Sequence, residues 1–295
     1  MSRPLFVHFL PDLVSPEQLS GGIVVVIDVL RASTTIATAL NHGAGRIIPC
    51  VSIDQALAVR DQEHVANRDQ RSATPANSGV LPLLGGERGG VRIEGFDLSN
   101  SPAEYEPQVV GGRTIVFTTT NGTRALARCE QAARILVGAF INLSAISRAL
   151  QADDRPVHLL CAGTDGSPTA EDILFAGALG HDVCVAAGSE GWTLSDSAEI
   201  AVAAWRGAVE MPCLEESSAG HVACRLRQEQ LSPHVFNALC RSRGGRNLLR
   251  LGYESDIRYC SQIDLISVLP VCQQMHRPQN QVSGPGIPSM EITLA

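Results

Sequence analysis

Residues 23–36 read IVVVIDVLRASTTI, a run of β-branched residues that stops at Asp28 and leads into a hydroxyl-rich segment. The first five residues are apolar without alternation, which is typical of a strand buried on both faces of a sheet. The segment that follows, 34–44, reads TTIATALNHGA and is expected to form a helix closed by Gly43. The stretch therefore predicts a strand, a polar joint and a helix, which is the repeating unit of an α/β fold.

The same design recurs further along the chain. Residues 113–130 read RTIVFTTTNGTRALARCE, and residues 157–163 read VHLLCAG before the helical TDGSPTAEDILFAGALGHDV of 164–183. We therefore expect an α/β fold with a layered, mixed or mostly parallel sheet flanked by helices. The C-terminal strand ends of such a sheet face one crevice, where ligands bind. Residues 1–272 are predicted to form a single large domain, with two sub-lobes meeting near residue 150 as the alternative, and 273–295 a polar tail.

Composition excludes several classes of partner. The chain has 295 residues, a formal net charge of −7 and 44% hydrophobic residues. A negative net charge disfavours a nucleic-acid partner, and no apolar run reaches the ~20 residues of a membrane span. The nine cysteines include no C-x-x-C pair and are expected to be buried thiols. We expect a cytoplasmic protein with neither a nucleic acid nor a membrane as partner, and leave a homodimer open.

The joint at Asp28 has two interpretations. Asp28 could simply cap the following helix, yet Ser33, Thr34 and Thr35 already supply capping groups. Arg31 is unusual because a cation near a helix N-terminus opposes the helix dipole. That cost is offset if an anion lies there, since guanidinium and backbone N–H groups together bind phosphate or sulfonate.

Three further segments offer similar chemistry. GGERGG (85–90) lets the backbone approach a ligand closely around Glu87 and Arg88, although a surface turn would read the same way. TTTNGT (118–123) can surround an oxyanion with hydroxyl and N–H groups, or merely cap a helix. Glu171 and Asp172 lie near a helix start, where acids also favour the dipole, and adjacent helix positions point about 100° apart, so one of the two is expected to face the crevice. Together with Asp28 and Glu87, such acids could supply an oxygen-rich site suited to Mg²⁺.

Several of these strings, in this order, resemble the 2-phosphosulfolactate phosphatase family (ComB-like). The resemblance rests on VVVIDVLRASTTIATAL, GGERGG, GFDLSNSPAEY, TTTNGTRAL and CAG followed by EDILFAGA. It implies a Mg²⁺-dependent phosphomonoesterase of α/β fold that hydrolyses 2-phosphosulfolactate, a small anionic phosphoester, to sulfolactate and phosphate during coenzyme M biosynthesis. Two positions depart from the family pattern: Ser99 stands where glycine is expected, and Ile173 where a further acid is common.

On this basis we assign roles to the site residues. The predicted catalytic residues are Asp28, Arg31, Glu171 and Asp172, with Arg31 holding the phosphate. Substrate-binding residues are predicted to be Ser33, Thr34, Arg88, Asn100, Thr119, Thr120, Asn121 and Arg124. The predicted metal ligands are Asp28, Glu87 and Asp172. Leu30 replaces the second acid of a D-x-D motif, so we favour direct attack by water over an aspartyl-phosphate.

Two other functions fit the same residues. A phosphosugar isomerase also uses Ser/Thr-rich loops at helix starts, but needs no metal. A non-catalytic sensor of small anions would need the same cradle without its carboxylates.

Overall fold

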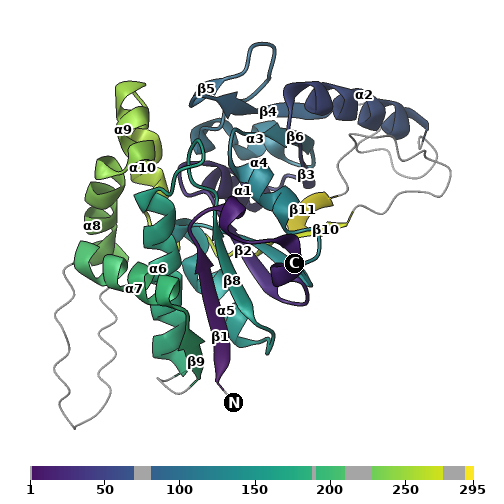
Figure 1. Ribbon diagram of the computed structural model, residues 1–295. Helices are drawn as coiled ribbons and strands as arrows, with labels where there is room; N and C mark the ends of the chain where they lie inside the picture. Colours follow the sequence, from purple (N-terminus) through teal and green to yellow (C-terminus); the bar gives the residue numbers. More distant parts are fainter. Residues whose placement is uncertain (1, 70–80, 188–190, 210–227, 275–289) are drawn as a thin grey trace, which may run out of the picture.

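The computed structural model describes residues 2–69, 81–187, 191–209, 228–274 and 290–295. An 11-stranded sheet runs through the centre of the molecule in the order β5-β4-β6-β3-β11-β10-β7-β2-β8-β1-β9. Helices cover both of its faces (Figure 1). The prediction of an α/β fold with a mostly parallel, mixed sheet is confirmed.

The sheet consists of two parallel blocks joined by an antiparallel hairpin. The first block contains β7 (Arg134–Gly138), β2 (Ile23–Ile27), β8 (Val157–Cys161), β1 (Arg3–His8) and β9 (Trp192–Leu194). The second contains β3 (Arg46–Pro49), β6 (Thr114–Thr118) and β4 (Leu83–Arg88), with the short β5 (Val91–Arg92) antiparallel at its edge. The hairpin consists of β10 (Pro270–Gln274) and β11 (Met290–Leu294).

Helices pack on both faces because buried strands present apolar side chains alternately to each. Ile23, Val25 and Ile27 of β2 contact one cluster, and Val24 and Val26 contact the other. The first cluster lies under α5 (Leu143–Gln151), α6 (Ala170–Ala187), α7 (Asp196–Ala208), α8 (Gln228–Arg241), α9 (Arg243–Arg250) and α10 (Glu254–Cys260). The second lies under α1 (Ala32–Asn41), α3 (Pro107–Val110) and α4 (Gly122–Arg128). A third, smaller cluster lies under α2 (Ile53–Asp69).

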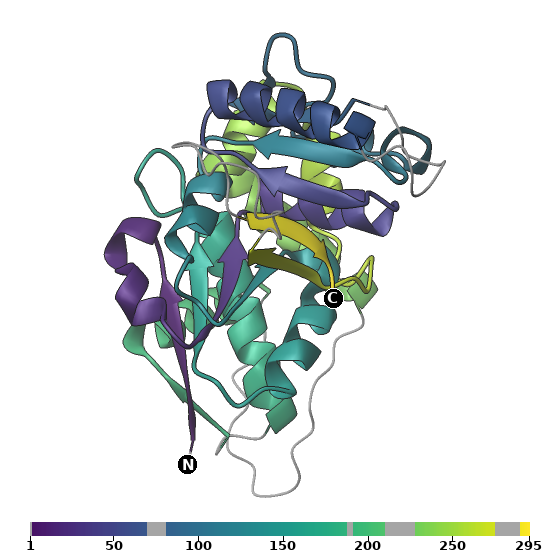
Figure 2. The ribbon, with the colours of Figure 1, turned by 90° about the vertical axis from the view of Figure 1, so that its right-hand side faces the viewer.

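Twist brings the two blocks into a crosswise arrangement. In Figure 2 strands of the first block run upwards, whereas β3 and β6 run across the view. A sheet of many strands accumulates such a rotation because each strand is turned relative to its neighbour. The carboxyl ends of β2, β4, β6 and β8 consequently approach one corner of the molecule, and residues that follow each of them line one pocket.

The prediction that residues 273–295 form a loose tail is wrong at both ends. Residues 270–274 form β10 and residues 290–294 form β11, in the middle of the sheet. Met290 and Ile292 are buried, and Ile292 pairs with Ile47 of β3. Residues 275–289 lie outside the described residues. The C-terminal strand therefore connects the two parallel blocks.

Replacing Ile292 by alanine tests this role. The side chain is fully buried, so Ile292→Ala is expected to lower the free energy of unfolding by about 2–5 kcal/mol. Leu294→Ala, on the same strand but 45% exposed, is the matched control and should cost less than about 1 kcal/mol. Denaturant unfolding of both variants measures the difference, and equal stabilities would contradict a structural role for β11.

Candidate active site

A polar cavity of about 540 Å³ opens at the corner where the strand ends meet. Its walls come from the segments after β2, β4, β6 and β8, from the start of α6 and from α9. Most of the charged side chains in the walls are acids at the strand ends and arginines on α9. The expectation that the crevice lies at the C-terminal strand ends is confirmed.

Among the described residues, five acids line this pocket: Asp165 forms an ion pair with Arg243, and the other four are Asp28, Glu87, Glu171 and Asp172. Burial, together with the nearby charge of Glu87, raises the pKa of Asp28 to about 7. Burial also raises the pKa of Glu171, against hydrogen bonds from the backbone and from Ser242. The pKa of Asp172 is raised well above its usual range by burial and by the charges of Asp28 and Glu171. Asp28, Glu171 and Asp172 therefore resist being ionised together.

Asp172 ties two strand ends together. Its Oδ1 accepts a hydrogen bond from the Val29 N–H at 2.9 Å, just after β2. Its Oδ2 accepts one from the Gly163 N–H at 3.0 Å, just after β8. Helix α6 begins at Ala170, so Asp172 lies in its first turn, and this turn is next to the ends of the two paired strands. Asp172 therefore fixes the floor of the pocket as well as contributing a charge to it.

In the second block, Glu87 likewise joins two segments of backbone, the turn after β4 and the loop after β6. Its Oε1 accepts from the Thr120 N–H at 2.8 Å, and its Oε2 from the Gly90 N–H at 2.7 Å. The GGERGG segment is thus the end of β4 and the turn into β5, and not a free loop. The buried carboxylate connects this turn to the loop that follows β6.

Asp28 both caps helix α1 and lines the pocket. Its Oδ1 accepts from the Ala32 N–H at 3.3 Å, at the start of α1. Its other oxygen, Oδ2, lies so close to Gly122 that a Cβ there would come within 2.8 Å of it. The two interpretations of this residue are therefore compatible.

Asp28 and Glu171 have more capacity to hold a cation than Glu87 and Asp172 have. Each oxygen of Glu87 and Asp172 accepts a backbone hydrogen bond, whereas the buried Oε2 of Glu171 has no partner among the described residues. Within the described ranges, no group of three or more His, Cys, Asp or Glu side chains forms a ready metal site. The predicted set of Asp28, Glu87 and Asp172 lines one pocket but is not such a group.

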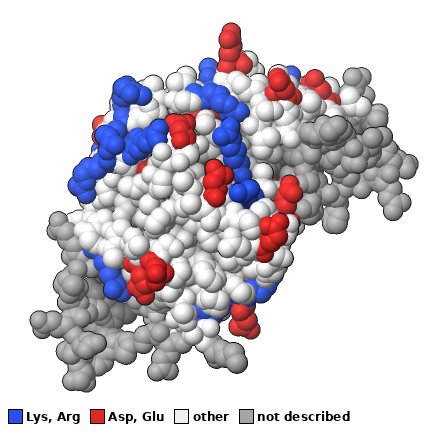
Figure 3. Space-filling model, in the orientation of Figure 1, with Lys and Arg blue, Asp and Glu red and all other residues white. Residues whose placement is uncertain are grey.

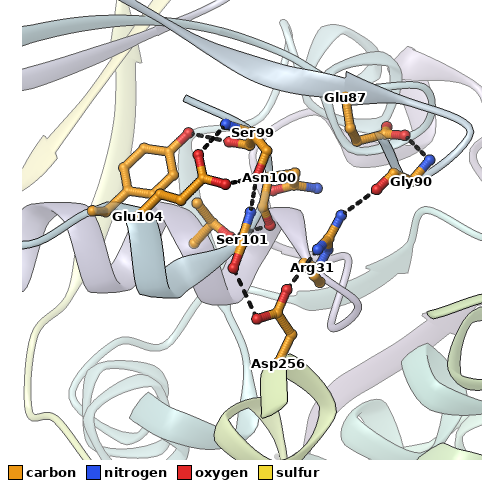
Figure 4. A network of polar contacts seen from close by, with 10 residues as sticks. Arg31, Glu87, Gly90, Ser99, Asn100, Ser101, Glu104 and Asp256 are labelled. Carbon is orange, nitrogen blue, oxygen red and sulfur yellow. Dashed lines mark hydrogen bonds and ion pairs between the residues drawn. The ribbon is translucent and has the colours of Figure 1, made fainter. Parts of the chain in front are cut away.

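Arg31 is a buried ion-pair partner and not a free cation. Its Nη1 lies 2.5 Å from Asp256 Oδ2 of α10, and its Nη2 donates to the Gly90 carbonyl at 2.8 Å (Figure 4). The guanidinium also stacks over the ring of Tyr253, 4.5 Å from its centroid. The sequence predicts a bound phosphate or sulfonate as the anion that offsets this cation, whereas in the structure the carboxylate of Asp256 does so. Arg31 still lines the pocket, and its role as a phosphate clamp stays a prediction.

Asp256 extends the same network towards Asn100. Its other oxygen accepts from Ser101 Oγ at 2.8 Å (Figure 4). Ser99, where the family resemblance leads one to expect glycine, donates through its hydroxyl to Glu104 at 2.6 Å. The same hydroxyl accepts from the Ser101 N–H at 3.0 Å. These bonds hold the loop that presents Asn100 to the pocket.

The hydroxyl groups after β2 do not face a ligand. Ser33 donates to the Val26 carbonyl and accepts from the Asp28 N–H, and Thr34 donates to the Val29 carbonyl. Both are buried and absent from the pocket lining as described. Their prediction as oxyanion donors finds no support in the geometry, because these hydroxyls bind backbone groups at the end of β2 and the start of α1.

Two predicted arginines also point elsewhere. Arg88 donates to Thr118 Oγ1 at 3.0 Å and to the Glu87 carbonyl, and Arg124 is exposed on α4. Neither belongs to the pocket lining in the described part of the chain. Their roles in holding the substrate therefore find no support in the geometry.

Asn100, Thr120 and Asn121 do line the pocket. Asn100 Oδ1 and the hydroxyl of Thr120 are buried without hydrogen-bond partners among the described residues. The same holds for the hydroxyl of Thr119, although Thr119 is behind the lining. Unpaired buried polar atoms at a pocket wall are suited to bind a ligand, because each costs free energy until it is satisfied.

Ile173 does not remove a ligand from this site. Its side chain packs against the apolar cluster under α5–α10 and is not part of the pocket wall. An acid in its place would therefore face the core and not the acid cluster.

Sequence reasoning missed the arginines of α9. Arg243, Arg246 and Arg250 all line the pocket, as does Asn247. The signal was present in SRGGRNLLR (242–250), where the basic residues recur at three- and four-residue spacing. Such a pattern is equally typical of a solvated helix face, so only the fold places it opposite the acids.

An α/β protein with acids and arginines facing one another at the strand ends is built to bind a small anionic ligand. A family model described as 2-phosphosulpholactate phosphatase matches residues 8–229 and 214–275. A probable 2-phosphosulfolactate phosphatase of Symbiobacterium thermophilum is 36% identical over 256 residues, covering 86% of this chain and 93% of the relative. Proteins described in the same words from Clostridium perfringens (strain 13) and Trichormus variabilis are each 32% identical, covering 88% and 92% of this chain and 89% and 96% of theirs.

The chain belongs to the 2-phosphosulpholactate phosphatase family. This confirms both the family resemblance seen in the sequence and the prediction of a phosphoric monoester hydrolase. Among the described helices, none is long and apolar enough to cross a bilayer.

The Arg31–Asp256 pair gives a stability prediction. Asp256→Asn leaves the Arg31 charge buried without its counterion, so the free energy of unfolding should fall by about 3–5 kcal/mol. Glu254→Gln breaks the exposed pair with Arg258 on the same helix and should cost less than about 1 kcal/mol. Denaturant unfolding compares the two, and an Asp256→Asn variant as stable as Glu254→Gln would contradict the structural role of the pair.

The raised pKa of Asp28 gives a pH prediction. An unfolded aspartate loses its proton near pH 3.8, whereas in the folded protein Asp28 keeps it up to about pH 7. Because the folded state binds the extra proton, its stability falls as pH rises through this window. Asp28→Asn removes this contribution, so its advantage over the wild type should grow from pH 4 to pH 8 in EDTA.

Denaturant unfolding at several pH values measures this difference. The exposed Asp12→Asn variant serves as the control, since Asp12 is 89% exposed and should leave the pH profile unchanged. Parallel profiles for Asp28→Asn and the wild type would contradict the raised pKa.

Proposed function

We propose that this protein hydrolyses 2-phosphosulfolactate, or a closely related small phosphorylated hydroxy-acid, to sulfolactate and phosphate. One observation carries the proposal: this chain belongs to the family, and in its pocket a cluster of acids faces the arginines of α9. The relatives are described as probable 2-phosphosulfolactate phosphatases, which supports the same substrate class.

The charge of this substrate suits such a divided pocket. Phosphate, carboxylate and sulfonate groups together carry roughly four negative charges at neutral pH. Arginines can bind two or more of the acid groups, but a phosphate beside Asp28 and Glu171 would be repelled. The cavity of about 540 Å³ is within the usual range for small-molecule sites.

We further propose that Mg²⁺ offsets this repulsion. The donor set fits: Mg²⁺ takes oxygen ligands and is commonly held by one or two carboxylates together with substrate phosphate oxygens and water. Glu171, whose Oε2 is buried without a partner among the described residues, is the residue that would hold it, with Asp28 beside it in the pocket. Glu87 and Asp172 would act from behind by fixing the surrounding backbone. When bound, the ion would neutralise charge on the phosphate and polarise it for attack.

The chain's own groups would then handle the proton. Asp28, with a pKa of about 7, can both accept and return a proton near neutral pH, as a general base or acid requires. Hydrolysis by direct attack of water needs a base for the water proton and an acid for the departing alkoxide. We assign this exchange to Asp28, since Leu30 takes the place of the second acid of an aspartyl-phosphate motif. The unpaired Thr120 hydroxyl would donate to a phosphate oxygen, whereas the unpaired Asn100 Oδ1 would accept a hydrogen bond from a water molecule in the pocket.

On the family resemblance alone, we place the reaction in coenzyme M biosynthesis and in the cytoplasm, with a homodimer left open. A metal-free phosphosugar isomerase and a non-catalytic anion sensor are not favoured, because the relatives are described as phosphatases.

Release of inorganic phosphate from 2-phosphosulfolactate tests the proposal. The wild type should release phosphate with Mg²⁺, and excess EDTA should abolish the activity. Asp28→Asn keeps the shape of the side chain but removes the base, so kcat should fall by about 100-fold or more. Asp12→Asn should behave as the wild type. Unchanged turnover by Asp28→Asn would refute the role of that residue, and activity in EDTA would refute the metal.

A further inference from the structure

One face of α9 presents its polar side chains to the pocket. Arg243, Arg246, Asn247 and Arg250 are three, four and seven residues apart, so they share one side of the helix. Leu248 lies on the other side and is buried in the core cluster under α5–α10. In Figure 3 a group of basic side chains lies over this helix, separated by acidic side chains from a second basic group.

The three arginines differ in what they bind. Arg243 is committed to the loop after β8, donating to the Thr164 carbonyl at 2.9 Å and to Asp165 Oδ2 at 2.8 Å. Arg246 donates to the Arg241 carbonyl, and Arg250 donates to Asn247 Oδ1 at 2.5 Å. Within the described ranges no carboxylate forms an ion pair with Arg246 or Arg250. These two guanidinium groups therefore bring positive charge to the pocket that no described acid neutralises.

Both ends of α9 are held at defined places in the pocket. A Cβ on Gly244 would lie 2.3 Å from Glu171 Oε1, so the start of the helix directly abuts the acid cluster. Near the other end, Asn247 Nδ2 approaches the Gly89 carbonyl at 3.5 Å, and a Cβ on Gly90 would lie 2.9 Å from Leu251. The helix thus spans the pocket from the acids to the β4–β5 turn.

The helix geometry sets the distances. With a rise of 1.5 Å per residue, Arg246 lies about 3 Å and Arg250 about 9 Å along the axis beyond Gly244. A ligand whose phosphate lies beside Glu171 would therefore extend its other acid groups along this row. A short three-carbon skeleton keeps those groups close enough for long arginine side chains to reach.

We propose that Arg246 and Arg250 form an anion subsite for the non-reacting acid group of the substrate, a sulfonate or a carboxylate. This rests on the proposed function, and it names the part of the pocket that selects phosphoesters carrying a second strong anion. A guanidinium is always charged and can hold a planar pair of anionic oxygens with two parallel hydrogen bonds. The acid end of the pocket would then handle the phosphate and the α9 face the rest of the ligand.

The test uses a substrate series that separates the two acid groups. 2-Phosphosulfolactate carries both, 2-phospholactate lacks the sulfonate, 2-sulfoethyl phosphate lacks the carboxylate, and isopropyl phosphate lacks both. Steady-state phosphate release is measured for the wild type, Arg246→Gln, Arg250→Gln and the control Arg241→Gln. Arg241 is exposed at the end of α8, two residues before α9, and its side chain does not line the pocket as described.

We expect each subsite variant to raise the KM for 2-phosphosulfolactate by about tenfold or more, as loss of a charged hydrogen bond does. The kcat should stay within about threefold, and the KM for isopropyl phosphate should not change. If 2-sulfoethyl phosphate is affected and 2-phospholactate is not, the subsite holds the sulfonate; the reverse pattern assigns it the carboxylate. An equal loss with isopropyl phosphate would overturn the proposal, because the arginines would then hold the phosphate. Unchanged KM values throughout would overturn it as well.

A binding measurement separates this proposal from the proposed reaction. Sulfolactate affinity is measured by calorimetry for the same variants, and it does not depend on turnover. If the wild type releases no phosphate but binds sulfolactate, and Arg246→Gln or Arg250→Gln weakens that binding, the reaction is refuted and the subsite is supported. Equal sulfolactate affinity in the wild type and both variants would refute the subsite.

Discussion

The carboxylate of Asp172 sets the geometry on which the pocket depends. By accepting the N–H groups of Val29 and Gly163, it joins the ends of β2 and β8 to the first turn of α6. The low-dielectric surroundings strengthen both hydrogen bonds. The same position places its charge beside Asp28 and Glu171, which is why the pKa of Asp172 is raised. The position of Asp172 therefore both fixes the strand ends and gathers acidic groups in the pocket.

Repulsion within this cluster shapes the rest of the site. Three acids with raised pKa values can lie together only if they share protons or face a cation. Arg31 cannot supply all of that positive charge, because Asp256 is its close partner. Among the described residues, the other arginines that line the pocket are on α9, and the absence of a side chain at Gly244 lets that helix approach Glu171 closely. The contact between α9 and α6 thus brings the opposite charges into one cavity.

Local sequence predicted the joints of this fold well, because strand, cap and helix signals are contiguous. Positions at strand ends and helix starts predict Asp28 and one of Glu171 and Asp172 in one crevice, whereas in the structure all three line it. The strand at 290–294 was missed because a five-residue segment has no local signal for the neighbours that pair with it. The partner of Arg31 is 225 residues away, so only the folded chain could reveal the pair.

The misassigned hydroxyls show why a joint rich in serine and threonine is a weak indicator of ligand binding. At the end of β2, Ser33 accepts from the Asp28 N–H and donates to the Val26 carbonyl, and Thr34 donates to the Val29 carbonyl. After β6 the hydroxyls of Thr119 and Thr120 stay unpaired within the described residues, because Glu87 binds the Thr120 N–H instead. The segments after β2 and β6 thus have similar compositions, but their hydroxyl groups differ in what they bind. A buried carboxylate from another strand takes over the backbone at the second joint and leaves the Thr120 hydroxyl free for a ligand.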